Sequence, residues 1–553
     1  MDVLILAAGL SSRLSNYTHD IIPKYLINLD NNTGLYYLIN YWNKYSENIY
    51  LVIHSKFNLI TTFYIKEILF EYESKIKIIN YDNSDGTAFT LSHILNNDLK
   101  NITCDNLLIT WCDLYPVGNI NFKKIKKNRA SSNNIHVLTY GNKCRYNLDE
   151  NNNIIYSPSS DGNIIGIYYF QNYKKFLLDS EKSFNNDIVL FLSEIGPINN
   201  IQLDFIVDYG DQDKLSTILN SSLNNKLNCR YFNSLSVIHS DKLLKKGLED
   251  IGKKIIQKEI EWFKHINNLE DRSFVHYLPH IYDYYDSAYL MEYRKDCMPL
   301  YQFFNKYQKL IDSLESFQEK SIKIAEYNIM KVTILKNVMD KIDLLHSSDT
   351  VYTSKISFVN NLKKEIFDKV IQRKKNIEKL LNYFGSITIV NNINILSFEN
   401  ILNKCKNILT NYYETIDEYK YSIILGDCTF SNILINPEDI SNIVFIDPRG
   451  YFGESNIHGP IEYDYAKILY SLSGYDQFNN EYFNIKSINK ENYSLEIDIK
   501  SIDIEDKIKN YYFNKVHEAY VVIIWLSLAE YCKNDIWKCL AAYYYGIYLG
   551  TKL

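Results

Sequence analysis

Short apolar segments alternate with stretches of helical periodicity over the first 220 residues. The strand-like segments are VLILAA (3–8), NIYLVIH (48–54), KIKIINY (75–81), NLLITW (106–111) and NIIGIYYF (163–170). Strands that alternate with helices predict an α/β domain with a largely parallel sheet. The periodicity is lost over residues 214–230, which are rich in Ser and Asn. We therefore predict a first domain of residues 1–222 and a second of residues 223–553.

The second region has a different pattern. Residues 230–247 contain strand-like segments, and GKKIIQKEIEWFKHI (252–266) has apolar residues at helical spacing. From about residue 300 the pattern is mostly helical, and residues 354–384 predict one long basic amphipathic helix, whose charge marks a solvated face. Two strand-like segments, NILI (432–435) and NIVFI (442–446), interrupt the helices.

Composition narrows the classes of function. The 553 residues include 60 basic and 66 acidic side chains, a net charge of −6, which argues against a nucleic-acid partner. The 9 cysteines contain no C-x-x-C pair, which indicates a reducing compartment rather than a disulfide framework. The apolar stretch 519–531 is interrupted by Glu530 and is too short to span a bilayer. We expect a cytoplasmic protein with no signal peptide and no membrane insertion.

The first candidate site follows the first strand. The segment VLILAAGLSSRL places Ala8, Gly9 and Leu10 in a loop that ends at Arg13, and Pro23 precedes Lys24. Gly9 allows backbone N–H groups to approach phosphate oxygens, and Arg13 can neutralise a departing pyrophosphate. The pattern matches neither a P-loop nor a G-x-G-x-x-G fingerprint. It predicts a site for a nucleoside triphosphate.

Three later segments extend this site. DGTAFTL (85–91) offers a small-residue turn, at Gly86 and Thr87, that fits against a nucleobase. Asp113 follows the apolar strand at 106–111, and Asp208 ends the segment FIVD. Carboxylates at strand ends of an open α/β sheet are suited to holding Mg²⁺ on phosphates.

Together these segments resemble the nucleotidyltransferases that join a nucleoside triphosphate to a phosphorylated alcohol or sugar. The resemblance covers about residues 1–220 and implies a Rossmann-like mixed sheet. It implies contacts to the nucleotide from Ala8, Gly9, Leu10, Arg13, Lys24, Gly86 and Thr87, catalytic roles for Lys24 and Arg13, and Mg²⁺ ligation by Asp113 and Asp208. Two features depart from the family pattern: Ser11 stands where many members have Gly, and residues 150–162 contain no clear Glu-x-Lys element.

The second candidate site lies in YSIILGDCTFSNILINPEDISNIVFIDPRG (421–450). Asp427 and Asn432 flank a loop that enters a strand, and Asp447 follows the next strand. Phosphoryl transfer needs a carboxylate to orient and deprotonate a hydroxyl, and oxygen ligands for Mg²⁺. Asp427 is placed for the first role, and Asn432 with Asp447 for the second.

This segment resembles the loop HGD-x-x-x-x-N of the aminoglycoside phosphotransferase and choline kinase family. The resemblance covers about residues 228–553 and implies a protein-kinase-like α+β domain, with a small lobe at 228–298 and a helical large lobe at 299–553. It implies that Lys245, or else Lys246, contacts the ATP phosphates with Glu259 as its partner. It also implies that Glu292 and Tyr293 hold adenine, that Asp464 is structural, and that Leu425 replaces the family's His.

The two resemblances together imply consecutive reactions. A kinase would phosphorylate an alcohol with ATP, and a nucleotidyltransferase would couple the product to CTP or another nucleoside triphosphate. Our first expectation is a CDP-alcohol from choline or a similar amino-alcohol, for decorating a surface glycan or lipid. The alternatives are a sugar 1-kinase coupled to NDP-sugar synthesis, and an active nucleotidyltransferase whose kinase-like domain only binds. Both reactions would use Mg²⁺, and a homo-oligomer is compatible with the sequence.

Overall fold

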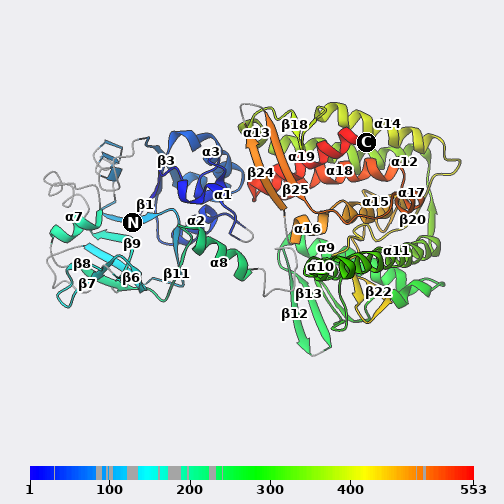
Figure 1. Ribbon diagram of the computed structural model, residues 1–553, viewed down its shortest axis with the longest axis horizontal. Coiled ribbons are helices and arrows are strands. Elements are labelled where there is room, and N and C mark those ends of the chain that lie inside the picture. Colours follow the sequence, from blue (N-terminus) through cyan, green and yellow to red (C-terminus); the bar gives the residue numbers. More distant parts are fainter. Residues whose placement is uncertain are drawn as a thin grey trace. The chain divides into compact units, whose positions relative to one another are not determined.

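The chain forms two compact units, which Figure 1 colours along the sequence. The structure is a computed structural model, and it describes all residues except 30–31, 83–89, 92, 95–96, 99–103, 121, 123–134, 158, 160–161, 172–187, 196–197, 223–231, 240, 481–482 and 490–492. One unit comprises Met1–Lys226 with Asn534–Ile536, and the other comprises Leu227–Lys533 with Trp537–Leu553. The boundary predicted after residue 222 adjoins residues 223–231, which lie outside the described residues.

A seven-stranded mixed sheet organises the first unit. Its strands are, in spatial order, β10 (Asn199–Gln202), β6 (Ile135–Cys144), β9 (Gly162–Gln171), β4 (Asn106–Trp111), β1 (Asp2–Ala7), β2 (Ile49–Ile53) and β3 (Ile76–Asn80). Strand β9 runs antiparallel to both of its neighbours, whereas the other pairs are parallel. The parallel-dominated α/β sheet predicted from the alternating pattern is thus confirmed.

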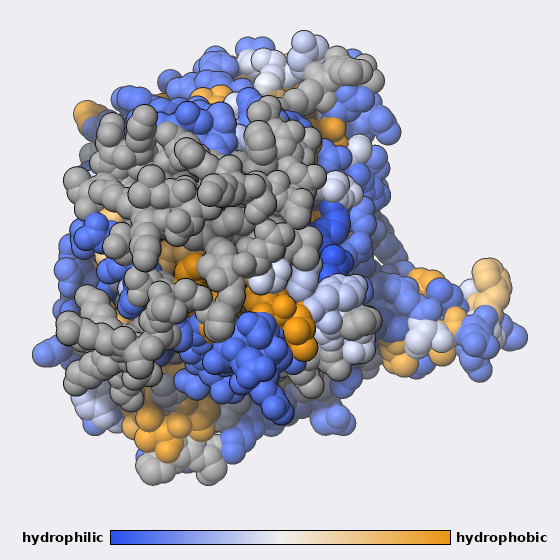
Figure 2. Space-filling model, turned by 90° about the vertical axis from the view of Figure 1, so that its left-hand side faces the viewer, coloured by the Kyte–Doolittle hydropathy of each residue, from blue (hydrophilic) through white to orange (hydrophobic). Residues whose placement is uncertain are grey.

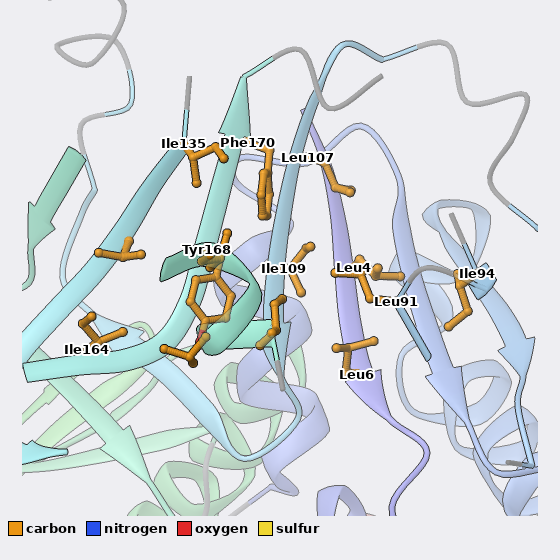
Figure 3. Close-up of a cluster of buried hydrophobic side chains, with 14 of the residues drawn as sticks. Leu4, Leu6, Leu91, Ile94, Leu107, Ile109, Ile135, Ile164, Tyr168 and Phe170 are labelled. Atoms are coloured by element: carbon orange, nitrogen blue, oxygen red, sulfur yellow. The ribbon is translucent and has the colours of Figure 1, made fainter. Parts of the chain in front are cut away.

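The core of this unit lies against the central strands. Figure 3 shows Leu4 and Leu6 of β1 beside Leu107 and Ile109 of β4, with Tyr168 of β9 in the same cluster. Every residue of β1 is buried, which explains why residues 3–7 are all apolar, because a central parallel strand is covered on both faces. The described α-helices of this unit are α1 (Ser15–Thr18), α2 (Gly34–Trp42), α3 (Asn58–Glu67), α7 (Ile188–Ile195) and α8 (Gln212–Ser222).

Two small antiparallel pairs complete the described part of the first unit. One pairs β7 (Tyr146–Leu148) with β8 (Ile154–Tyr156), and the other pairs β5 (Leu114–Val117) with β11 (Phe205–Asp208). In the second pair Leu114 lies opposite Asp208. This register brings two predicted site residues, Asp113 and Asp208, to the same end of the ribbon.

The second unit begins with an antiparallel sheet and one long helix. The sheet has the order β12 (Asn233–His239), β13 (Lys242–Gly247), β15 (Ala288–Glu292) and β14 (Ile281–Tyr285). Helix α9 (Asp250–Asn268) contacts β13 and β15 through a face that includes Ile256, Ile260 and Phe263. A Cβ atom at Gly252 would lie 2.1 Å from the Phe232 carbonyl oxygen, so this close approach of α9 requires glycine.

The rest of the second unit is mostly helical. Its helices are α10 (Leu300–Asp312), α11 (Phe317–Ser348), α12 (Lys355–Leu362), α13 (Lys369–Phe384), α14 (Phe398–Glu414), α15 (Ile461–Leu472), α16 (Tyr475–Asn480), α17 (Asp506–Tyr512), α18 (Lys515–Tyr531) and α19 (Ile536–Lys552). Helix α18 contains the stretch predicted as a buried helix, and it contacts α13, α14 and α15. The helix predicted over 354–384 is present, with a π-helical turn at Lys363–Asp368 between α12 and α13.

Three further sheets accompany these helices. The first has the order β16 (Met298–Pro299), β21 (Ile433–Asn436) and β22 (Asp439–Phe445). The second has the order β17 (Thr350–Tyr352), β20 (Lys420–Ile423) and β23 (His458–Gly459). The third has the order β19 (Ile393–Asn394), β18 (Ile389–Val390), β25 (Ser494–Ile499) and β24 (Phe483–Asn489). Neither of the last two sheets was predicted from the sequence. No described helix combines the length and apolar character needed to cross a membrane, and the described residues visible in Figure 2 are mostly hydrophilic.

Candidate functional site

The loop after β1 leaves its backbone accessible. Gly9 and Leu10 are exposed, and Ala8 is half-buried. A Cβ atom built on Gly9 would meet no described atom within 4 Å. No described residue therefore requires glycine at position 9, and the described part of the unit leaves the space above this backbone open to a ligand.

Ser11 continues the loop in a left-handed conformation, with φ 63° and ψ 25°. This region favours glycine, so the serine is strained. Its hydroxyl oxygen accepts a hydrogen bond of 3.0 Å from the backbone N–H of Lys24. The side chain thus offsets part of the strain and fixes the segment that carries Lys24 against the loop.

The two predicted carboxylates of this unit meet at Gly210. A Cβ atom there would lie 2.6 Å from Oδ2 of Asp113 and 3.3 Å from Oδ1 of Asp208. The backbone N–H of Gly210 donates to Asp208 Oδ1 over 2.9 Å, and that of Tyr209 donates to the carbonyl oxygen of Asp113 over 3.2 Å. The structure thus brings together two aspartates that are far apart in the sequence.

Each carboxylate holds a lysine. Lys24 forms an ion pair with Asp113, and Lys214 lies 2.6 Å from Asp208. Burial opposes the charged form of both lysines, but their carboxylate partners outweigh it and raise the pKa of each. Arg13 is exposed, and its charge works against the rise in the pKa of Lys24, which indicates that the two cations are near each other.

Lys214 was missed in the sequence analysis. The available signal was its place in the first turn of a helix, six residues after Asp208. Gly86 and Thr87, predicted to contact the base, lie outside the described residues. Together, the described part of this site offers an open loop, two carboxylates and three cations, a combination suited to a polyphosphate and a hard divalent cation.

In the second unit, a buried lysine holds two carboxylates. Nζ of Lys245, on β13, lies 2.8 Å from Oε2 of Glu259 on α9 and 2.8 Å from Oδ1 of Asp447. Burial disfavours the ammonium group, but Asp447 and Glu259 outweigh it and raise the pKa of Lys245. Lys246, the alternative candidate, is exposed. The hydroxyl group of Tyr289 also donates to Glu259 over 2.8 Å.

Asp427 and Asn432 lie on one loop before β21. The side-chain amide of Asn432 donates to the carbonyl oxygen of Asp427 over 2.8 Å, and the backbone N–H of Thr429 donates to the same oxygen over 2.8 Å. These bonds close the loop into a tight turn. The carboxylate of Asp427 and the amide oxygen of Asn432 are both ligand types that suit Mg²⁺.

Backbone hydrogen bonds hold the loop after β22 beside this turn. The N–H of Ile446 donates to Asn432 over 2.9 Å, and the N–H of Arg449 donates to Leu425 over 2.7 Å. Asp447, between them, has φ 54°, a left-handed conformation that is uncommon for a residue other than glycine. The bonds on both sides of Asp447 stabilise it there. The structure therefore unites Asp427 and Asn432 with Asp447, Lys245 and Glu259.

Asp464 fixes the chain before Asp427. Its carboxylate, fully buried on α15, accepts hydrogen bonds from the backbone N–H of Leu425 over 2.9 Å and of Gly426 over 2.7 Å. His346 contacts the same carboxylate at 3.1 Å. The Leu425 side chain is 1% exposed, as expected for packing into the core. A backbone clamp and apolar packing therefore set the shape of this segment.

Lys467 is a site residue that sequence reasoning missed. It lies one helical turn after Asp464 and places Nζ 2.9 Å from Oδ1 of Asp427. Burial opposes its charge, but Asp427 outweighs this and raises the pKa of Lys467. The signal was a lysine in the otherwise apolar helix segment AKILYSL.

Arg449 was also missed. Its guanidinium group pairs with Glu365, donates to the hydroxyl of Tyr463 over 2.9 Å and stacks on Tyr451, 4.2 Å from the ring centroid. Lys369 lies 2.8 Å from the same Glu365 carboxylate. The loop that carries Asp427 thus has a cationic surrounding.

The predicted adenine contacts lie at the end of β15. The N–H of Glu292 donates to the carbonyl oxygen of His280 over 2.8 Å, and the N–H of Tyr293 donates to that of Asp241 over 2.8 Å. Both backbone donors are therefore already paired. The role of these two residues in binding adenine stays a prediction.

Comparisons with known proteins give only structural likenesses. No family model and no curated protein matches the chain. Solved structures with similarity include HddC of Yersinia pseudotuberculosis, at 22% identity over 40% of this chain and 98% of that one with a TM-score of 0.32. A nucleoside-diphosphate-sugar pyrophosphorylase of Vibrio cholerae is similar at 18% identity over 40% of this chain and 100% of that one, with a TM-score of 0.32. A UDP-glucose pyrophosphorylase of Acinetobacter baumannii is similar at 12% identity over 40% of this chain and 93% of that one, with a TM-score of 0.31.

Burial of Asp476 beside the second site predicts that the stability of the fold depends on pH. Asp476 is buried and accepts a 2.8 Å hydrogen bond from the N–H of Ser431, directly before Asn432. Burial raises the pKa of Asp476 from 3.8 to about 6. The folded state therefore binds more protons than the unfolded state between these values, and stability falls as the pH rises through this range. Relative to Asp476→Asn, the wild type should lose roughly 3 kcal/mol of unfolding free energy between about pH 4 and pH 7.

Chemical denaturation of both chains across this pH range measures the difference. Asp340→Asn, at an exposed position, serves as the control and should follow the wild type. Parallel stability curves for Asp476→Asn and the wild type would contradict the prediction.

Proposed function

We propose that the chain is a bifunctional enzyme. Its second unit would transfer a phosphoryl group from ATP to the hydroxyl of a small alcohol, and its first unit would join the product to a nucleotide and release pyrophosphate. The observation that carries the proposal is the position of Lys245, 2.8 Å from both Glu259 and Asp447, beside the loop that carries Asp427. In protein kinases, a lysine–glutamate pair of this kind and a metal-binding aspartate must both be in place for phosphoryl transfer.

The second unit supplies each part that this reaction needs. Lys245 would bind the ATP phosphates, and Asp427 would orient the acceptor hydroxyl and accept its proton. The oxygen atoms of Asn432 and Asp447 fit Mg²⁺, which when bound neutralises charge on the phosphates. The antiparallel sheet with α9, followed by a mainly helical part, supports a kinase-like, two-lobed fold.

The first unit supports transfer of a nucleotidyl group. The loop of Ala8, Gly9 and Leu10 would receive the triphosphate, while Arg13 and Lys24 would bind its charge. Asp113 and Asp208 would hold Mg²⁺ through their carboxylate oxygens. The two reactions are ROH + ATP → RO-phosphate + ADP, and RO-phosphate + NTP → NDP-OR + pyrophosphate.

The acceptor defines two candidate pathways. Our first candidate is an amino-alcohol such as choline, converted with CTP to a CDP-alcohol. A specific observation favours the second candidate, a sugar phosphorylated at its anomeric hydroxyl and coupled to form an NDP-sugar. Lys467 contacts Asp427, and Arg449 lies on the adjoining loop. These cations neutralise the carboxylates of Asp427 and Glu365, which therefore attract a quaternary ammonium group less, whereas binding of a neutral sugar does not depend on that attraction.

Separate substitutions test the two-reaction proposal. Asp113→Asn should reduce nucleotidyl transfer by at least about a hundredfold and leave phosphorylation unchanged, and Asp427→Asn should do the reverse. Both substitutions keep the shape of the side chain and remove its charge. Mass spectrometry of reactions with ATP, each NTP and a panel of amino-alcohols and sugars measures both products.

Asp213→Asn and Asp340→Asn, at exposed positions in the two units, are the controls. Loss of both activities in either test variant would contradict the assignment of two sites. A wild-type chain that transfers nucleotides but phosphorylates no acceptor would leave the second unit as a binding module.

A series at Gly9 tests the open phosphate loop. Gly9→Ala and Gly9→Val add atoms where a Cβ meets no described atom within 4 Å, so the melting temperature should change by less than about 2 °C. The added atoms should weaken NTP binding progressively, by about tenfold or more for valine, because they occupy the path of the phosphates. Calorimetric titration of each variant with the preferred NTP measures this. Undiminished binding by Gly9→Val would exclude the loop from the site.

A further inference from the structure

Three potential metal ligands, none of which has been assigned a role above, converge in the second unit. They are His265, Asp349 and His458, and their ligand atoms all lie within 4.8 Å of one another. Nε2 of His265 is 2.7 Å from Oδ2 of Asp349, and Nε2 of His458 is 2.9 Å from the same oxygen. Two imidazole rings from distant parts of the chain are therefore aimed at one carboxylate oxygen.

Each of the three residues comes from a different element. His265 lies in the last turn of α9, Asp349 caps the C-terminus of α11, and His458 begins β23. His458 lies opposite Ile423 of β20, so a sheet fixes its backbone. Asp349 is tied to the same strand, because its carbonyl oxygen accepts a hydrogen bond from the N–H of Ile423 over 3.2 Å.

We propose that His265, Asp349 and His458 form a binding site for a divalent transition metal ion of the zinc class. Two imidazole nitrogens and one carboxylate oxygen are a ligand set that Zn²⁺ prefers, whereas Mg²⁺ and Ca²⁺ prefer oxygen ligands alone. The site is thus chemically distinct from the carboxylate clusters that would hold Mg²⁺ in the two reactions.

The two nitrogen–oxygen distances require only a small adjustment. Ligand atoms about 2.1 Å from a tetrahedral ion lie about 3.4 Å apart, so these distances would widen by about 0.7 Å at His265 and about 0.5 Å at His458. Small rotations of the three side chains would be enough to widen these distances. The side chains of His265, Asp349 and His458 are 37%, 26% and 13% exposed, which leaves one side of the cluster open for water as a fourth ligand.

The position of His265 gives the site a structural consequence. Helix α9 also carries Glu259, the partner of Lys245, and Trp262, whose indole N–H donates to the carbonyl oxygen of Ile424 over 2.9 Å. An ion bound at the end of this helix would join it to α11 and β23. The metal would therefore restrain the helix that positions Glu259.

Metal titration of the full chain tests the proposal. The protein is stripped with a chelator and dialysed, and Mg²⁺ is added in excess to fill oxygen-rich sites. Co²⁺ is then titrated while its visible ligand-field absorption is recorded, and Zn²⁺ is used to displace it. We expect one ion per chain and no sulfur-to-cobalt charge-transfer band, because the ligands are nitrogen and oxygen.

Substitutions locate the bound ion. His265→Gln and His458→Gln should each weaken binding by at least about a hundredfold, and His276→Gln, at an exposed position outside the cluster, should bind as the wild type. Zn²⁺ should also slow hydrogen exchange of α9 in the wild type and not in His265→Gln, which changes a half-buried side chain in the last turn of the helix and is expected to preserve the fold. A wild type without Co²⁺ absorption, a charge-transfer band from cysteine, or wild-type affinity in either cluster variant would each overturn the proposal.

Discussion

The buried ammonium group of Lys245 is the interaction on which the second unit's site depends. A lysine in an apolar interior is costly unless it is paired, and removing one partner of a buried pair typically costs about 3–5 kcal/mol. Here Glu259 and Asp447 supply the partners from α9 and from the loop after β22. If either carboxylate moved away, the buried ammonium group of Lys245 would lose a partner that offsets its charge. The ion pairs therefore hold β13, α9 and the loop after β22 in position relative to one another.

The first unit uses its charges differently. Lys214 and Asp208 are 50% and 33% exposed, so water already reaches this pair, whereas Lys24 and Asp113 are only 18% and 10% exposed. An exposed ion pair contributes about 0–1 kcal/mol, so Lys214 is readily transferred to a stronger anion. The proposed triphosphate would take Lys214 from Asp208 and free the carboxylate oxygens of Asp208 in the same event. At Gly9 no described side chain has to move first, because no described atom lies within 4 Å of a Cβ built there.

The sequence predicted the features that depend on local pattern. The central strands, α9 and the buried α18 follow from apolar periodicity, and the pairing of Lys245 with Glu259 followed from a family resemblance. Strands β24 and β25 were missed because FNIKSIN and SLEIDI mix polar with apolar residues in short segments. Lys214 and Lys467 were missed because only the folded structure shows that they contact Asp208 and Asp427. The spacing of these residues along the sequence does not reveal the contacts.

The clamp by Asp464 has a consequence for how such sites are recognised. The shape of the loop before Asp427 depends on two backbone N–H groups and on a carboxylate 38 residues beyond Gly426. Backbone groups are the same whatever residue is present, so the side chain at position 425 need only fill a small apolar space. The clamp therefore tolerates different side chains at position 425. For the same reason, the residue at position 425 identifies a loop of this shape less reliably than the distant aspartate that clamps it.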